Sequence, residues 1–185
     1  MQRTVRITHL EMRSPEALRP SARVPRDLLL LRVGLPAPEL GRFLYTAVGG
    51  DWYWRERLSW AWSRWHSWLS RPEVETWVAY QSGSPAGYFE LESHAEGSVQ
   101  ITYFGLLPGF IGKGLGGYLL TQAIDRAWRV MPGVSRVWVH TCTLDHPGAL
   151  ANYLARGFEV FREEEHAVLL PEVPPGPWPG AERPR

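Results

Sequence analysis

A run of glycines between an apolar segment and a helical pattern has the composition of a site that binds phosphate. Residues 112–117 contain four glycines and the only lysine of the chain, Lys113. The apolar run before them is typical of a strand that ends at Leu107, and a helical pattern follows them. Bare backbone N–H groups at the positive end of a helix favour an anion. The segment therefore predicts a phosphate-binding loop.

Two common phosphate-binding loops fit these residues poorly. The spacing of Gly112, Gly114 and Gly117 satisfies the dinucleotide pattern G-x-G-x-x-G, which should open a βαβ unit and precede an acidic residue at the end of the next strand. Here the pattern follows a set of antiparallel strands, and the next strand ends near His140. The loop of nucleoside triphosphatases requires Ser or Thr after Gly-Lys, and Lys113 is followed by glycine. We set both interpretations aside.

The loop resembles the coenzyme-binding motif of the GCN5-related N-acetyltransferase (GNAT) superfamily, which runs Gln/Arg-x-x-Gly-x-Gly/Ala after a strand ending in apolar-x-Pro. Residues 106–108 match the strand end, and Gly114 and Gly116 match the motif glycines. Ile111 stands where the motif has Gln or Arg, so one side-chain anchor is missing. The resemblance implies acetyl-coenzyme A (acetyl-CoA), held mainly by backbone N–H groups. It implies these coenzyme-binding residues: Leu106, Leu107, Ile111, Gly112, Lys113, Gly114, Leu115, Gly116 and Gly117.

A second segment carries the same resemblance. In residues 149–158 the pattern Ala-x-x-x-Tyr-x-x-x-Gly-Phe, centred on Tyr153, is similar to the late helix and following strand of the superfamily. The two motifs come in the superfamily's order, and the resemblance covers roughly residues 76–170. It implies further coenzyme contacts at His146, where the superfamily commonly has asparagine, and at Asn152.

The chemistry that this resemblance implies needs a polarised thioester carbonyl, an uncharged amine and a proton for the departing thiolate. Tyr153 resembles the superfamily's proton donor, and a phenol with a pKa of about 10 is protonated at neutral pH. We expect the carbonyl to meet a backbone N–H at Leu106 or Leu107, where two parallel strands splay. Two general bases stay open: Glu90, on a strand face toward the acceptor, and His140, at a strand end.

Four side chains near the end of that strand also have zinc-ligating types: His140, Cys142, Asp145 and His146. We favour another interpretation, in which Asp145 or His146 begins the last helix and Pro147 lies in its first turn, so no metal is expected. Cys142 lies on an apolar strand without an obvious activating partner. Its setting favours direct transfer in a ternary complex over a cysteine-linked intermediate.

Tryptophan is concentrated in one segment, because residues 52–69 hold six of the ten in the chain. Three follow one helical stripe and three lie off it: Trp54, Trp62 and Trp65 on the stripe, and Trp52, Trp60 and Trp68 off it. Stripe residues fit core packing, whereas the others could wall a pocket for a cationic amine or a flat substrate, or form a partner surface. Core, pocket and interface therefore stay open.

The elements that position these groups follow from periodicity and turn residues. Strands are expected over residues 4–12, 28–33, 75–81, 87–94, 100–106 and 136–141, and also over 158–161 and 166–170 around an acidic turn at 163–165. Helices are expected over residues 39–45, 52–69, 117–131 and 149–156. This order predicts an α/β fold: a mixed, mostly antiparallel central sheet with flanking helices and a central parallel strand pair. The resemblance to the superfamily implies that this pair splays at the cofactor site.

Size and composition limit the function classes. The 185 residues, 44% of them hydrophobic, predict one domain over residues 1–170 and a Pro-rich tail, 171–185, that we expect to be disordered. A net charge of +1 without a basic tail argues against nucleic acid as a partner. Apolar runs stay far below the roughly 20 residues that cross a bilayer, and we see no signal peptide. With a single cysteine, these features predict a cytoplasmic protein without a membrane partner.

Together these features predict an N-acetyltransferase that transfers an acetyl group from acetyl-CoA to a primary amine of a small molecule or peptide. The alternative is a non-catalytic acyl-CoA-binding module that uses the tryptophan-rich segment to bind a partner protein. The resemblance also makes a homodimer possible, since dimers are common in the superfamily.

Overall fold

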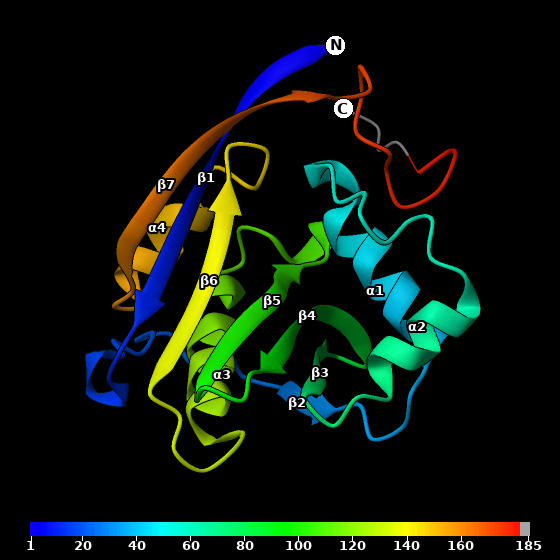
Figure 1. The fold of residues 1–185 in the computed structure, drawn as a ribbon. Coiled ribbons are helices and arrows are strands. Elements are labelled where there is room, and N and C mark those ends of the chain that lie inside the picture. The colour runs from blue at the N-terminus through cyan, green and yellow to red at the C-terminus, as the bar shows by residue number, and fades with distance from the viewer. Residues whose placement is uncertain (182–185) are drawn as a thin grey trace.

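A seven-stranded sheet forms the centre of the computed structural model, which describes residues 1–181 (Figure 1). Its strands are β1 (Gln2–Met12), β2 (Leu28–Arg32), β3 (Val74–Gln81), β4 (Ser84–Ser93), β5 (Ser98–Leu106), β6 (Arg136–Cys142) and β7 (Glu159–Leu169). They lie in the order β2-β3-β4-β5-β6-β1-β7. Every neighbouring pair is antiparallel except β5 and β6, which are parallel. The fold class expected from the sequence is confirmed.

Helices cover both faces of this sheet (Figure 1). They are α1 (Pro38–Gly49), α2 (Trp62–Leu69), α3 (Leu115–Arg129) and α4 (Ala149–Ala155), with one-turn 3-10 helices η1 (Pro15–Ala17), η2 (Gly50–Trp52) and η3 (Pro108–Phe110). Alternation along β4 separates the faces: Phe89 and Leu91 pack under α3, whereas Tyr88 packs under α1. Within residues 1–181, no helix is both long and apolar enough to cross a membrane.

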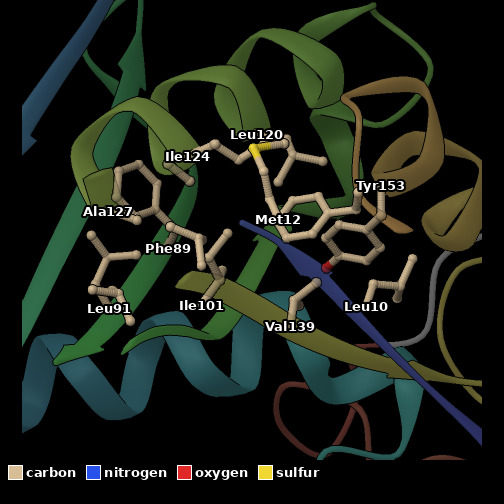
Figure 2. Close-up of a cluster of buried hydrophobic side chains, with 14 of the residues drawn as sticks. Leu10, Met12, Phe89, Leu91, Ile101, Leu120, Ile124, Ala127, Val139 and Tyr153 are labelled. Atoms are coloured by element: carbon tan, nitrogen blue, oxygen red, sulfur yellow. The ribbon is translucent and has the colours of Figure 1, made fainter. Parts of the chain in front are cut away.

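The larger core lies between α3 and the sheet. Leu120, Ile124 and Ala127 recur at helical spacing and are fully buried, and Figure 2 shows them turned toward strand side chains such as Phe89 and Leu91. Each buried leucine or isoleucine stabilises the fold by about 1.5–3 kcal/mol. This packing fixes the position of α3, and with it the glycine loop that precedes the helix.

The helix expected over residues 52–69 is wrong for its first half. η2 ends at Trp52, Tyr53 adopts a left-handed conformation with φ 60°, and α2 begins only at Trp62. Tertiary contacts override the helical spacing of the tryptophans, because the Trp54 ring packs so closely on Gly49 that a Cβ there would collide with it. The segment before α2 therefore folds back on the end of α1.

The acidic turn expected at residues 163–165 is also wrong, because β7 runs through it as one strand beside β1. Each carboxylate finds a cross-strand partner: Glu163 accepts from the Thr8 hydroxyl at 3.2 Å, Glu164 contacts His9 at 2.7 Å and Glu165 accepts from Arg6 at 3.0 Å. Such pairs stabilise a strand that its own sequence disfavours.

The expected tail contains neither helix nor strand from residue 171 to residue 181. The Gly176 N–H donates to the Gly50 carbonyl at 3.1 Å, and the Tyr53 hydroxyl donates to the Glu172 carbonyl at 3.4 Å. The tail is thus bonded to η2 and the residue after it. Its last part, residues 182–185, lies outside the described residues.

A buried ion pair joins the segment before α2 to the sheet. Arg57 and Glu90 are 4% and 2% exposed, and two guanidinium nitrogens donate to the two carboxylate oxygens at 3.0 and 2.8 Å. The indole N–H of Trp68 donates to the same carboxylate at 3.0 Å. Rings of Trp60, Trp68 and Tyr103 lie 4.4–4.6 Å from the guanidinium carbon. Burial alone would lower the pKa of Arg57, but the charge and hydrogen bonds of Glu90, together with Tyr103 and Tyr88, raise that pKa above its usual value.

We predict that Arg57→Met destabilises the fold by about 3–5 kcal/mol, because it leaves the Glu90 charge buried and unpaired. The measurement is the free energy of unfolding from urea denaturation. The double variant Arg57→Met/Glu90→Gln should recover part of that loss, and Arg55→Met, an exposed neighbour, should change little. A double-mutant cycle with no coupling energy would contradict this account.

Candidate active site

A cavity of about 670 Å³ opens where β5 and β6 separate. The two strands pair from Ser98 and Arg136 only as far as Gln100 and Trp138. Both strands continue beyond that point, and residues from both line the cavity. The splay of the parallel pair, expected from the sequence, is confirmed.

An extra residue in β5 accompanies this separation. Opposite β4, Glu90 pairs with Tyr103 and Leu91 with Ile101, so Thr102 forms a bulge. A bulge bends its strand and increases the local twist, which takes β5 out of register with β6 where the cavity begins. The Thr102 hydroxyl oxygen is buried on the cavity wall and has no hydrogen-bond partner within residues 1–181.

The splay also decides which backbone amide faces the cavity. The Leu107 N–H donates to the Ala86 carbonyl at 2.9 Å and is already used. Bonds alternate along an antiparallel ladder, so the Leu106 N–H points away from β4, into the gap that β6 leaves. Leu106 lines the cavity, whereas Leu107 does not.

The glycine loop forms one wall. Gly112 and Gly114 both have φ 79°, in the left-handed region that favours glycine. Among the described residues, no side chain caps α3 at its start, so its first N–H groups are free for an anion. The loop residues on the wall are Ile111, Gly112, Gly114, Gly116 and Gly117. Lys113 instead lies over the Phe110 ring, and Leu115 is buried in the core.

Two arginines that sequence reasoning missed flank this loop. A Cβ added at Gly114 would collide with the Arg23 guanidinium, and one at Gly117 would lie 3.1 Å from Arg156 Nη1. The Ser21 N–H ties the Arg23 segment to a threonine hydroxyl on α3 at 3.0 Å. Neither arginine forms an ion pair within residues 1–181. Their separation from the loop in sequence left no signal for this cluster.

Tyr153 also lies on the cavity wall. Its side chain is largely buried, with the Phe104 and Phe158 rings edge-on at 6.1 and 5.9 Å between centroids. Burial, and then the charge of Asp145, raise the pKa of the phenol above its usual value. The hydroxyl is therefore protonated throughout the physiological range.

The segment before α4 differs from expectation, because the helix begins only at Ala149, after Pro147. Asp145 does not cap it: the carboxylate accepts from the Cys142 N–H at 3.0 Å and from the Thr141 hydroxyl at 2.7 Å. His146 accepts from the Gly148 N–H at 3.0 Å. Asp145 and His146 both line the cavity. Asn152 lines it too, and its amide donates to the Gly116 carbonyl at 3.3 Å.

The remaining wall is aromatic and acidic, and its residues are Val48, Trp52, Tyr53, Trp54, Glu56 and Tyr103. The Trp54 ring lies 4.8 Å from that of Tyr103, and its N–H is 3.5 Å from Asp145. The Trp52 ring lies 5.3 Å from that of His146. Trp52 and Trp54 therefore line the cavity, whereas Trp60 and Trp68 pack around Arg57.

The two candidate bases occupy different places. His140 lines the cavity, and Glu90 does not. Desolvation by the surrounding walls, and then repulsion from His9, lower the pKa of His140, so its imidazole is neutral at pH 7. Burial, and then the Asp145 charge, raise the pKa of the Cys142 thiol to about 11. Within residues 1–181, no three His, Cys, Asp or Glu side chains are grouped to hold a metal ion.

Comparison with known proteins gives a family and a fold. Residues 42–158 match the model described as the Acetyltransferase (GNAT) family. The chain is 32% identical over 81 residues to S-alkylcysteine N-acetyltransferase from Bacillus subtilis (strain 168), a match that covers 39% of this chain and 46% of that protein.

Solved structures of GCN5-related N-acetyltransferases share the fold. The protein from Kribbella flavida has a TM-score of 0.64 at 18% identity, covering 90% of this chain and 59% of that one. The protein from Sphaerobacter thermophilus has a TM-score of 0.64 at 19% identity, covering 94% and 53%. The chain thus spans about half the length of each of these three proteins.

We predict that Arg23→Ala weakens binding of coenzyme A about tenfold, the loss of one hydrogen bond to a charged group. The measurement is the dissociation constant from calorimetric titration with coenzyme A. Arg26→Ala, which removes an exposed arginine three residues away, is the matched control. Equal affinities for Arg23→Ala and the unchanged protein would show that Arg23 does not contact the coenzyme.

Proposed function

This chain belongs to the GNAT family of acetyltransferases, and from that premise we propose that it transfers an acetyl group from acetyl-CoA to a primary amine of a small molecule or peptide. Transfer is direct, in a ternary complex. The observation that carries the proposal is a single cavity shared by the glycine loop, the end of β5 and Tyr153. The same cavity thus holds hydrogen-bond donors that suit a phosphate, at the glycine loop, and a carbonyl oxygen, at the end of β5, together with a proton donor for a leaving sulfur, Tyr153.

The residues present fit the coenzyme. Uncapped N–H groups at the start of α3 suit its pyrophosphate, and Arg23 and Arg156 add the positive charge that Ile111 does not supply. Asn152, bonded to Gly116, keeps α4 against the loop. When bound, acetyl-CoA supplies the thioester that is attacked. Each of these coenzyme contacts is a proposal.

Leu106 and Tyr153 take the two electrostatic roles. The Leu106 N–H, directed into the gap beside β6, donates to the thioester carbonyl and stabilises the charge that develops on its oxygen. The Tyr153 hydroxyl gives its proton to the departing thiolate. Its raised pKa keeps that proton in place until the sulfur takes it.

His140 is a better base than Glu90. Both Glu90 oxygens already accept charge-assisted bonds from Arg57, and the carboxylate is closed off from the cavity. His140 lines the cavity in its neutral form, so it can take a proton from the amine directly or through water. Glu90 serves instead to position the acceptor side, because its partner Arg57 lies against the Tyr103 ring.

Two further observations bear on the alternatives. Cys142, with its thiol pKa raised to about 11, is a poor nucleophile at neutral pH, which favours direct transfer. Trp60 and Trp68 pack around Arg57, so among the tryptophans of residues 52–69 only Trp62, which is 58% exposed, presents most of its ring to a partner protein. The catalytic function therefore accounts for more of the structure than a non-catalytic binding module does.

We predict that the protein binds acetyl-CoA and acetylates amines, and that Tyr153→Phe lowers kcat about a hundredfold while coenzyme affinity stays within a factor of a few. Calorimetric titration measures binding, and release of free thiol in an amine screen measures turnover. Tyr118→Phe is the matched control, since Tyr118 follows the loop without lining the cavity. No binding at millimolar coenzyme would overturn the function, and full turnover by Tyr153→Phe would remove the proposed acid.

We also predict an acid limb in the pH profile of kcat that belongs to His140. Its pKa is lowered, so the active neutral imidazole is lost only as pH falls below the ordinary value of about 6.5. Initial rates at saturating substrates should rise from acid pH and level off before pH 7, and His140→Gln should abolish that limb. The same limb in His140→Gln would assign the base to another group.

A further inference from the structure

The part of the cavity wall that we assign to the acceptor is aromatic and acidic, and its residues are Trp52, Tyr53, Trp54, Glu56, Tyr103 and Asp145. Its side chains include two carboxylates, Glu56 and Asp145, but no arginine or lysine lines any part of the cavity among the described residues. Resting on the proposed function, we infer that the acceptor is a cationic amine with an aromatic or apolar body and without a carboxylate next to its amino group.

Neither carboxylate is neutralised by the protein. The Glu56 carboxylate accepts from the Tyr45 hydroxyl at 2.9 Å and from the backbone N–H of Arg55 at 3.3 Å, and both donors are neutral groups. The donors to Asp145 are likewise neutral: a hydroxyl, a backbone N–H and the Trp54 indole. Neither residue forms an ion pair within residues 1–181. Two negative charges therefore remain for a ligand.

The charges of Glu56 and Asp145 act on the pKa values of neighbouring titratable groups. After burial, the Asp145 charge further raises the pKa of Cys142, and Glu56 adds to the effect. Both carboxylates also oppose the lowering of the pKa of His140. Among the described residues, His140 and His146 are the only side chains on the cavity wall that could carry a positive charge.

Cations outside the wall do not change the balance. Arg57 lies behind the Tyr103 ring, 4.4 Å from its centroid, and is paired with Glu90. Arg3 lies 5.9 Å from the centroid of Tyr53 but does not line the cavity. An acceptor carboxylate would therefore meet two like charges and no fixed cation, an arrangement that costs binding energy.

The apolar part of the acceptor has a matching surface. Trp52, Tyr53, Trp54 and Tyr103 line the same part of the cavity. Aromatic rings stack on flat apolar bodies and attract a cation over their faces. Together with the two carboxylates, these walls select an amine that is charged at one end and apolar along its length.

The test compares acceptors that differ only in the carboxylate. Initial rates with acetyl-CoA give kcat/KM for tryptamine, tryptophan amide and tryptophan, and for phenethylamine against phenylalanine. We expect tryptamine to exceed tryptophan by about tenfold or more, and tryptophan amide, which keeps the side branch but loses the charge, to exceed tryptophan as well. Tryptophan equal to or better than its amide would overturn the inference.

Two variants tie that preference to the named residues. Glu56→Gln and Asp145→Asn should each raise KM for tryptamine and lower the ratio of kcat/KM for tryptamine to kcat/KM for tryptophan. The control Glu159→Gln, at an exposed residue of β7, should change neither that KM nor that ratio. Glu56 is exposed, so its variant remains informative if Asp145→Asn misfolds. If both carboxylate variants fold and keep the original ratio of kcat/KM for tryptamine to kcat/KM for tryptophan, the inference is overturned.

The outcomes separate this inference from the proposed function. Acetylation confined to carboxylate-bearing amines, with coenzyme bound, would overturn the acceptor class and leave the acetyltransferase function in place. Coenzyme binding without acetylation of any amine would overturn the function and the acceptor class together.

Discussion

The separation of β5 from β6 is the constraint on which the site depends. Parallel strands that stayed paired to their ends would use the Leu106 N–H in the ladder and leave no space between them. The bulge at Thr102 ends that pairing after Gln100. One extra residue thus yields a free donor and a cavity that both the glycine loop and Tyr153 line. The cost is lost ladder bonds and a Thr102 hydroxyl that has no partner in the described part of the chain, which packing under α3 must offset.

A second device steadies the other side of the cavity. Residues 53–61 contain no regular helix or strand, yet they carry much of the aromatic wall. Arg57 reaches from this segment into the sheet, where Glu90 fixes its guanidinium and three rings enclose it. A charged pair of this kind adds little net stability, but its bidentate geometry allows one arrangement only. The segment is therefore held in place without regular secondary structure.

Local patterns predicted the parts of the site that are built from consecutive residues. The glycine loop, the strand before it and the segment around Tyr153 each carry their signal within about ten residues, and the sheet followed from their order. The sequence could not predict contacts between distant segments, such as Arg23 against Gly114 or Arg57 against Glu90. The prediction of one helix over residues 52–69 was wrong for the same reason, since packing of Trp54 on Gly49 outweighs the helical spacing. At residues 163–165, pairing with β1 outweighs turn composition.

The bond between Gly176 and Gly50 links two parts of the chain that lie far apart in sequence. A Cβ at Gly50 would press on the backbone of Gly176 and Pro177, so the tail is packed closely against η2. Trp52 and Tyr53, which follow Gly50, line the part of the cavity where we propose that the acceptor binds. Changes in the tail therefore reach the aromatic wall without altering any residue that touches an acceptor. On the proposed function, a change in the tail can alter acceptor preference while every residue on the cavity wall stays the same.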